Sequence, residues 1–437
     1  MSDERAKAGA GPRKAGERGA DARDSAGPAR GTGASGPLAG LRVLELGQLI
    51  AGPFAGRLLA DFGADVIKVE PPARAGAAVG DPLRKWRKLH PDDASGTSLW
   101  WYVQARNKRS ITLDLRNAEG QRIARELAAR SDIVIENFRP GALEKWGLGY
   151  DELAKGNPGL ILLRLSGYGQ SGPYRDRPGF GAIAESMGGM RYVTGFPDRP
   201  PVRLNLSIGD SLAALHGLIG VLMALHRRRE TGRGQVVDVA LYEAVFNLME
   251  STLPEYDRYG IVRERTGTNL TGIVPSNTYP TADGRHIVIG GNGDSIFKRL
   301  MRAIGRTDLA EDPTLADNAG RAARAQEIDD AIAQWTSSQS LEAALDVMAR
   351  AEVPSGRIYS AADMVDDPQY LARAMIERTT LPDGTPLAIP GIVPKFSETP
   401  GETRWVGPAL GEHTAEVLGE LGYDEEAIGK LRESGAV

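Results

Sequence analysis

The sequence predicts an α/β protein with two domains: a large domain built on an open, doubly wound parallel sheet of the Rossmann type, and a smaller α+β domain. Strand-like and helix-like segments alternate before residue 170, which is typical of a parallel sheet. From about residue 265, Pro, Gly and Thr interrupt the chain and the segments become shorter. A length of 437 residues also favours more than one domain.

The alternation begins with one βαβ unit. "LRVLEL" is a buried strand, "GPFAGRLLADFG" is a helix that ends at Gly63, and "ADVIKVE" is a second strand. "RSITLDL", "SDIVIEN" and "LILLRLSGYG" predict three more strands, with a helix capped by Asn117 after the first of them. Ligands of such sheets bind at the carboxyl ends of the strands. We therefore expect function in "GQLIAGP", "EPPARAG", "ENFRPGALEK" and "SGYGQSGPYRDRPGFG".

The second half of the chain starts with "GDSLAALHGLIGVLMALHRRRE", which is apolar on all sides and predicts a buried helix. "QVVDVALYEAVFNLME" predicts a strand and then a helix, and "RHIVIGG" a strand of the second domain. The predicted divisions are a disordered tail at 1–36, the large domain at 37–230 completed by about 395–437, a linker and helix at 231–264, the small domain at 265–365, and a return linker at 366–394.

Composition excludes several classes of function. The net charge of −4 provides no broad basic surface, so nucleic acid is not an expected partner. The absence of Cys removes disulfides, thiolate zinc sites and cysteine nucleophiles. The five histidines form no H-E-x-x-H pair, so no metal site is expected, and no G-x-S-x-G is present.

The sequence shows no pattern typical of a signal peptide, a transit peptide or a membrane-spanning segment. The Gly/Ala/Arg/Asp-rich tail has no apolar stretch of the signal-peptide kind, and its acids argue against a transit peptide. The most apolar window, "SLAALHGLIGVLMALH", is too short and too interrupted to span a bilayer. We expect a cytoplasmic protein with no membrane partner.

The sequence gives little support for a dinucleotide-binding site. The first strand-to-helix turn, "LGQLIAGPFAG", lacks G-x-G-x-x-G, although Glu70 closes the next strand where a ribose-binding acid would stand. We interpret Glu70 as a polar strand end. A nucleotide-dependent oxidoreductase remains a disfavoured alternative.

Asp210, in "SIGDSLAALHG", permits two interpretations. Asp is a preferred N-cap residue, so it could serve only to begin the helix. Alternatively, the helix N-terminus holds its carboxylate ionised for nucleophilic attack, while Gly209 leaves room for an acyl group.

Six stretches, in this order, resemble the class III CoA-transferases, a superfamily that includes formyl-CoA transferase, carnitine CoA-transferase and alpha-methylacyl-CoA racemase. They cover the chain from about residue 38 to its end: "AGPFAGRLLADFGADVIKVE", "NKRSITLDLR", "IVIENFRPGALEKWGLGYDEL", "LSGYGQSGPY", "GDSLAALHGLIGVLMALHRRRETGRGQVVDVALYEA" and "LGEHTAEVLGELGY".

The resemblance implies that Asp210 is the nucleophile of an enzyme that transfers CoA from an acyl-CoA to a free carboxylic acid, through an aspartyl anhydride and an aspartyl-CoA thioester. It implies an interlocked homodimer of ring-like chains, with acyl-CoA as substrate and no permanently bound cofactor. Arg139 and Lys145 are the expected phosphate partners. The implied CoA-binding residues are Ile50, Ala51, Leu113, Asp114, Leu115, Arg116, Asn137, Phe138, Arg139, Lys145, Gly179, Phe180 and Gly181.

The sequence departs from the family at three places. Phe180 and Gly181 stand where racemases have a His-Asp pair, which argues against racemisation. "GIVPSNTYPTADG" and "GGNGD" replace only loosely the glycine loop of formyl-CoA transferase, and Arg74 comes a few residues later than the family's Arg. Arg203 is a candidate partner for a dicarboxylate acceptor.

Three alternatives in function stay open from the sequence. An acyl-CoA isomerase or racemase, or an enzyme that moves CoA within one molecule, would share the fold. A non-catalytic acyl-CoA-binding protein would bind CoA esters without a covalent intermediate.

Overall fold

The computed structural model describes residues 35–73, 79–91 and 96–437, so the predicted tail lies almost wholly outside the described residues, as does Arg74. The large lobe contains a six-stranded sheet in the order β3-β2-β1-β4-β5-β6, in which every adjacent pair is parallel. This is the doubly wound order of Rossmann folds. The strands are β1 (Arg42–Glu45), β2 (Asp65–Glu70), β3 (Lys108–Thr112), β4 (Ile133–Glu136), β5 (Ile161–Ser166) and β6 (Val236–Ala240).

Helices cover both faces of the sheet because successive strand residues point to opposite sides. Val43 faces a cluster with α1 and α8, whereas Leu44 faces one with α3, α5, α18 and α19. The helices of this lobe are α1 (Ala51–Asp61), α2 (Leu99–Gln104), α3 (Ala118–Ala129), α4 (Ala142–Lys145), α5 (Tyr150–Gly156), α6 (Gly181–Met187), α7 (Met190–Val193), α8 (Ile208–Thr231), α9 (Leu241–Phe246), α10 (Thr252–Tyr259), α18 (Thr414–Leu421) and α19 (Glu425–Glu433), with the 3₁₀ turn η1 (Pro82–Lys85).

The small lobe has its own sheet and core. Its strands pair antiparallel in the order β7-β8-β9, and helices pack on them around a separate apolar cluster. The elements are β7 (Ser276–Pro280), β8 (His286–Gly290), β9 (Ser355–Arg357), α11 (Asp294–Ala303), α12 (Thr307–Glu311), η2 (Pro313–Leu315), α13 (Asn318–Ala323), α14 (Ala325–Thr336) and α15 (Leu341–Arg350). "GIVPSNTYPTADG" and "GGNGD" belong to this lobe.

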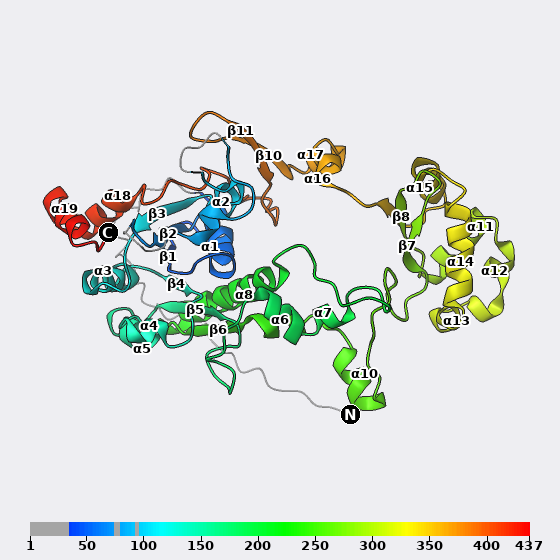
Figure 1. Cartoon of the computed structure of the whole chain (residues 1–437), viewed down its shortest axis with the longest axis horizontal. Helices are drawn as coiled ribbons and strands as arrows, with labels where there is room; N and C mark the ends of the chain where they lie inside the picture. Colours follow the sequence, from blue (N-terminus) through cyan, green and yellow to red (C-terminus); the bar gives the residue numbers. More distant parts are fainter. Residues whose placement is uncertain (1–34, 74–78, 92–95) are drawn as a thin grey trace, which may run out of the picture.

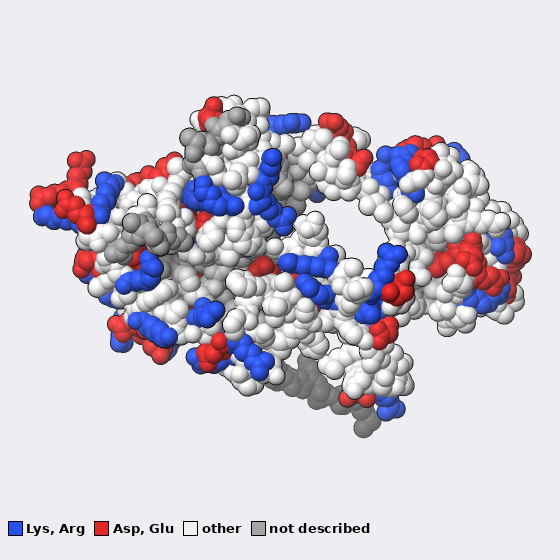
Figure 2. Space-filling model, in the orientation of Figure 1, with Lys and Arg blue, Asp and Glu red and all other residues white. Residues whose placement is uncertain are grey.

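Two connections join the lobes, one leading from α10 to β7 and the other from β9 to α16 (Figure 1). The space-filling view shows an opening between them, so the single chain encloses a hole (Figure 2). The returning segment contains α16 (Ala361–Met364), α17 (Pro368–Ala372) and the hairpin of β10 (Ile376–Thr380) and β11 (Pro386–Pro390).

Two sequence predictions about α8 and the strand that follows it are wrong. The strand Val236–Ala240 pairs with β5 inside the large sheet, whereas the boundary at residue 230 assigned it to a linker. Helix α8 is not fully buried, because Leu215, Ile219 and Met223 are 41%, 51% and 66% exposed. Pairing and coverage depend on which segments meet in space, and apolar periodicity does not report that.

The prediction that the most apolar window is too short for a bilayer also needs correction. Helix α8 spans 24 residues and is long and apolar enough to cross a membrane by length and composition alone. In this fold one face of α8 packs on β5, β6, α1 and α9. That face explains part of its apolar character, because the residues that cover a sheet must also be apolar.

Candidate active site

A cavity of about 850 Å³ opens beside the carboxyl ends of β1, β4 and β5. Strands β1 and β4 are neighbours in the sheet, and the strand order reverses between them, which is where open α/β sheets bind ligands. Its lining comes from six stretches of the large lobe and two single residues. They are Gln48–Ala51, Trp86–Arg87, Asn137–Phe138, Leu165–Gly167, Gly179–Ala182 and Arg203–Ser207, with Asp210 and Leu241.

Asp210 lies in the first turn of α8 and lines this cavity. The helix begins at Ile208 after Ser207, so Asp210 is not the N-cap residue, and the capping interpretation is wrong. Among the described residues its carboxylate forms no ion pair, and the side chain is partly buried. Its place near the positive end of the helix dipole agrees with the prediction.

Glycine at residue 181 leaves room for this carboxylate. A Cβ there would lie 3.0 Å from Asp210 Cγ and would overlap Oδ2. Gly209, by contrast, is buried against the Gly181 carbonyl and Glu185, so it makes room for helix packing rather than for an acyl group. Gly167 and Gly179 also approach closely, because a Cβ on Gly179 would lie 3.0 Å from the Gly167 Cα.

The electrostatic environment makes Asp210 a stronger base than a free aspartate. Its pKa is raised to about 6: burial raises it most, the nearby Glu185 carboxylate adds to the rise, and Arg203 partly opposes it. The sequence had suggested that the helix dipole keeps the group ionised, but desolvation is the larger effect. A carboxylate with a raised pKa is a better nucleophile once it is ionised.

Glu185 and Arg203 form an ion pair beside Asp210. Arg203 Nε lies 3.1 Å from Glu185 Oε2, and Arg191 Nη2 lies 3.6 Å from the same oxygen. Glu185 is only 2% exposed, so its charge requires these cations. Arg203, predicted as the partner of a dicarboxylate, is therefore already paired with a protein carboxylate, which it shares with Arg191.

The loop after β1 is held by side chains from other strands. Asn137 Nδ2 donates to the Gln48 carbonyl at 2.8 Å, and the Gln48 amide donates to Asn137 Oδ1 at 2.7 Å. The Leu49 amide donates to Asp81 Oδ1 at 3.0 Å, which supports the left-handed backbone of Leu49 (φ 64°). The Gln48 side chain makes no hydrogen bond with other described residues and lines the cavity.

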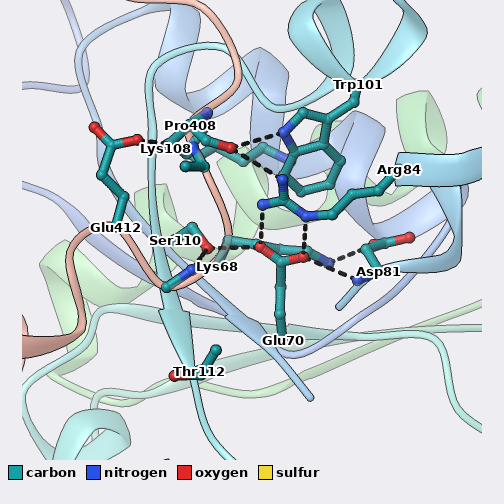
Figure 3. A network of polar contacts seen from close by, with 12 residues as sticks. Lys68, Glu70, Asp81, Arg84, Trp101, Lys108, Ser110, Thr112, Pro408 and Glu412 are labelled. Carbon is teal, nitrogen blue, oxygen red and sulfur yellow. Dashed lines mark hydrogen bonds and ion pairs between the residues drawn. The ribbon is translucent and has the colours of Figure 1, made fainter. Parts of the chain in front are cut away.

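A buried polar network lies beneath this loop (Figure 3). Lys68 donates to the Gly47 carbonyl and lies 2.8 Å from Asp81 Oδ2. Glu70 binds Arg84 at 2.7 Å, accepts from Ser110 at 2.6 Å and accepts from the Asp81 amide at 2.9 Å. The Glu70 carboxylate is thus occupied by protein groups, which explains its strand-end position without a ribose.

The predicted site residues fall into two groups. Asp210, Ile50, Ala51, Asn137, Phe138, Gly179, Phe180 and Gly181 all line the cavity. The remainder lie outside that lining. Leu113, Asp114 and Leu115 are buried after β3, Arg116 is exposed and ion-paired to Asp114, and Arg139 and Lys145 are exposed. For these six residues, contact with CoA stays a prediction.

Several residues at the site were missed as candidates from the sequence. Gln48, Trp86 and Arg87 line the cavity, and Glu185 pairs with Arg203 behind Asp210. Gln48 belongs to "GQLIAGP", one of the stretches expected after a strand, so its position was available as a signal. The other three come from segments with no distinguishing pattern.

The chain matches known proteins over most of its length. The model of CoA-transferase family III matches residues 38–414. Succinyl-CoA–D-citramalate CoA-transferase of Chloroflexus aurantiacus is 51% identical, over 91% of this chain and 97% of that protein. Succinate–glutarate CoA-transferase of Agrobacterium fabrum is 36% identical, over 88% and 96%.

Solved structures agree with this assignment. A CAIB/BAIF family protein from Brucella suis is 35% identical and superposes with a TM-score of 0.75, covering 89% of this chain and all of that one. The shared fold, the family match and the sequence identity point to the same conclusion: the chain belongs to CoA-transferase family III and is an enzyme of that class.

Proposed function

We propose that the enzyme transfers CoA from succinyl-CoA, or a similar acyl-CoA, to a dicarboxylic acid through covalent intermediates on Asp210. The single observation that carries this is the position of Asp210: an unpaired carboxylate of raised pKa in the cavity at the sheet's switch point. The donor and acceptor class follow from relatives named for succinyl-CoA, citramalate, succinate and glutarate.

The proposed chemistry needs no redox change and no net proton transfer. An Asp210 oxygen attacks the thioester carbonyl, the C–S bond breaks, and an aspartyl anhydride and CoA thiolate form. The thiolate attacks Asp210 Cγ and expels the donor acid, leaving an aspartyl-CoA thioester. The acceptor carboxylate displaces this thiolate to give a new anhydride, which the thiolate cleaves to release the new acyl-CoA and free Asp210.

We assign the residues around Asp210 separate roles in this reaction. Burial and Glu185 keep the pKa of Asp210 raised, and the missing side chain at Gly181 leaves room for the carboxylate. The side-chain amide of Gln48, which bonds no other described residue and stands on a loop fixed by Asn137 and Asp81, is a donor available to an oxyanion in the cavity. No side chain at Gly181 supplies a base, which disfavours the racemase alternative.

We also propose that two chains interlock as a dimer. The ring encloses an opening, and large apolar side chains are exposed on α8 and on α10, among them Met223, Leu253 and Tyr259. Apolar patches of this kind mark protein interfaces. A second chain that passes through the opening would cover them.

Chemical trapping tests the covalent mechanism. Protein is incubated with succinyl-CoA and then with hydroxylamine, and peptides are analysed by mass spectrometry. An aspartyl hydroxamate at Asp210, lost in Asp210→Asn together with CoA exchange, is the expected result. Asp151→Asn is the matched control, because Asp151 is an exposed carboxylate in the first turn of α5.

Other outcomes discriminate the alternatives. Exchange that persists in Asp210→Asn would overturn the mechanism. Product formed from an acyl-CoA without any added acid would favour an enzyme that moves CoA within one molecule. Tight binding of CoA esters with neither exchange nor adduct would favour a binding protein.

A further inference from the structure

Arg87 is a second cationic residue at the catalytic cavity, and the structure assigns it no acidic partner. Its guanidinium lies 4.8 Å from the centre of the Trp100 ring, and it makes no ion pair with any residue in the described part of the chain. It lines the same cavity as Asp210. Stacking on an aromatic face fixes the plane of a guanidinium while leaving its N–H edge available.

The charged residues that line the cavity differ in whether a protein group of opposite charge is already paired with them. Among the described residues only Arg87, Arg203 and Asp210 are charged there. Arg203 lies 3.1 Å from the buried Glu185, so it already has a carboxylate partner within the protein. Arg87 therefore contributes one uncompensated positive charge to a cavity that otherwise has one reactive carboxylate.

The backbone of Arg87 supports a functional role for this placement. Its φ of 61° is in the left-handed region, which a residue with a long side chain rarely adopts. Leu49, which also lines the cavity, has a φ of 64°. Such conformations concentrate at ligand sites, where the fold imposes them.

We infer that Arg87 binds the free, distal carboxylate of a dicarboxylic acyl group and thereby selects dicarboxylic over monocarboxylic substrates. This inference rests on the proposed function. A dicarboxylic acyl group keeps one ionised carboxylate after the other has become the thioester, and that charge needs a partner when it leaves water. A guanidinium fork matches a carboxylate with two parallel hydrogen bonds.

Equilibrium binding isolates this contact from catalysis. Dissociation constants for succinyl-CoA, butyryl-CoA and free CoA are measured on Asp210→Asn protein, with and without Arg87→Gln. Succinyl-CoA and butyryl-CoA differ mainly in the distal carboxylate. We expect Arg87→Gln to weaken succinyl-CoA binding roughly tenfold to a hundredfold, and to leave butyryl-CoA and CoA within about twofold.

Lys88→Gln is the matched control, because Lys88 is the adjacent exposed cation and lies outside the cavity lining. It should change none of the three constants. If Arg87→Gln fails to fold, judged by circular dichroism, Arg87→Lys replaces it. That variant keeps the charge but loses the fork, so it should weaken only succinyl-CoA binding, by a smaller factor.

Two results would overturn the inference. Equal weakening of all three ligands would show that Arg87 binds a CoA phosphate, and unchanged constants would show that it binds neither group. Both are separable from failure of the proposed function, which would appear as an absence of CoA exchange in the wild-type enzyme.

Discussion

Asp210 and Gly181 are in such close contact that a methyl group at residue 181 would overlap the Asp210 carboxylate. Asp210 lies in the first turn of α8 and Gly181 is the first residue of α6, and these two helix starts meet at the cavity. The contact fixes the position of the Asp210 carboxylate from one side. It also leaves no space for an ionisable side chain at residue 181. The resemblance places this residue at the His-Asp pair of the superfamily's racemases.

Gly181→Ala should displace the Asp210 carboxylate and lower kcat. Displacement of a reacting group by about 1 Å costs on the order of a hundredfold in rate. We expect a loss of that size in CoA exchange with a smaller change in KM. Gly419→Ala is the control, because nothing lies within 4 Å of a Cβ at residue 419 of α18. Full activity in Gly181→Ala would show that the carboxylate can move without loss.

The pH dependence of kcat/KM should report the pKa of Asp210. That pKa is raised to about 6, and the nucleophile is the ionised form. Activity should therefore fall about tenfold per pH unit below 6 and level off above it. An unchanged kcat/KM between pH 5 and pH 7 would contradict this assignment.

Arg203→Gln tests the direction in which the pH profile should shift. Arg203 lowers the pKa of Asp210, so its removal should shift the acidic limb of kcat/KM to higher pH. The shift is measured against wild type with the same acyl-CoA and acceptor. A shift to lower pH would show that Arg203 does not stabilise the ionised Asp210.

Asp81→Asn should destabilise the fold through the network beneath the active-site loop. Lys68 is 1% exposed and would lose its ion pair with Asp81, leaving Glu45 at 3.3 Å as its acidic partner. Breaking a buried pair in this way costs about 3–5 kcal/mol in the free energy of unfolding. Urea unfolding measures it, and Glu426→Gln, which breaks an exposed pair with Lys430, should change it little.

The proposed dimer predicts that charge on the exposed face of α8 disrupts assembly. Ile219 and Met223 are both largely exposed in the single chain. Replacing both with Glu should convert a dimeric mass to a monomeric one in light scattering coupled to size-exclusion chromatography. Lys430→Glu, on α19, is the control for added negative charge. A mass that is monomeric for the wild type would refute the dimer directly.

The sequence by itself determined much of the architecture. Apolar strands alternating with helices predicted the parallel sheet, because each parallel strand needs a crossover and both sheet faces must be apolar. The resemblance to class III CoA-transferases marked Asp210, Asn137 and Gly181, and the last two also fall in stretches expected to carry function after strands. These signals are local: each depends on residues that are close together along the chain.

Only the tertiary structure decided how the site works. Arg87 and Asp210 line one cavity, and Glu185 lies near Asp210, because the segment after η1 and the first turns of α6 and α8 come together at the same strand ends; no local pattern encodes that arrangement. The raised pKa of Asp210 comes from burial and from Glu185; Arg203 pairs with Glu185, whereas Arg87 has no ion pair within the described ranges. Desolvation and charge compensation depend on distances through space, and the fold alone sets those distances.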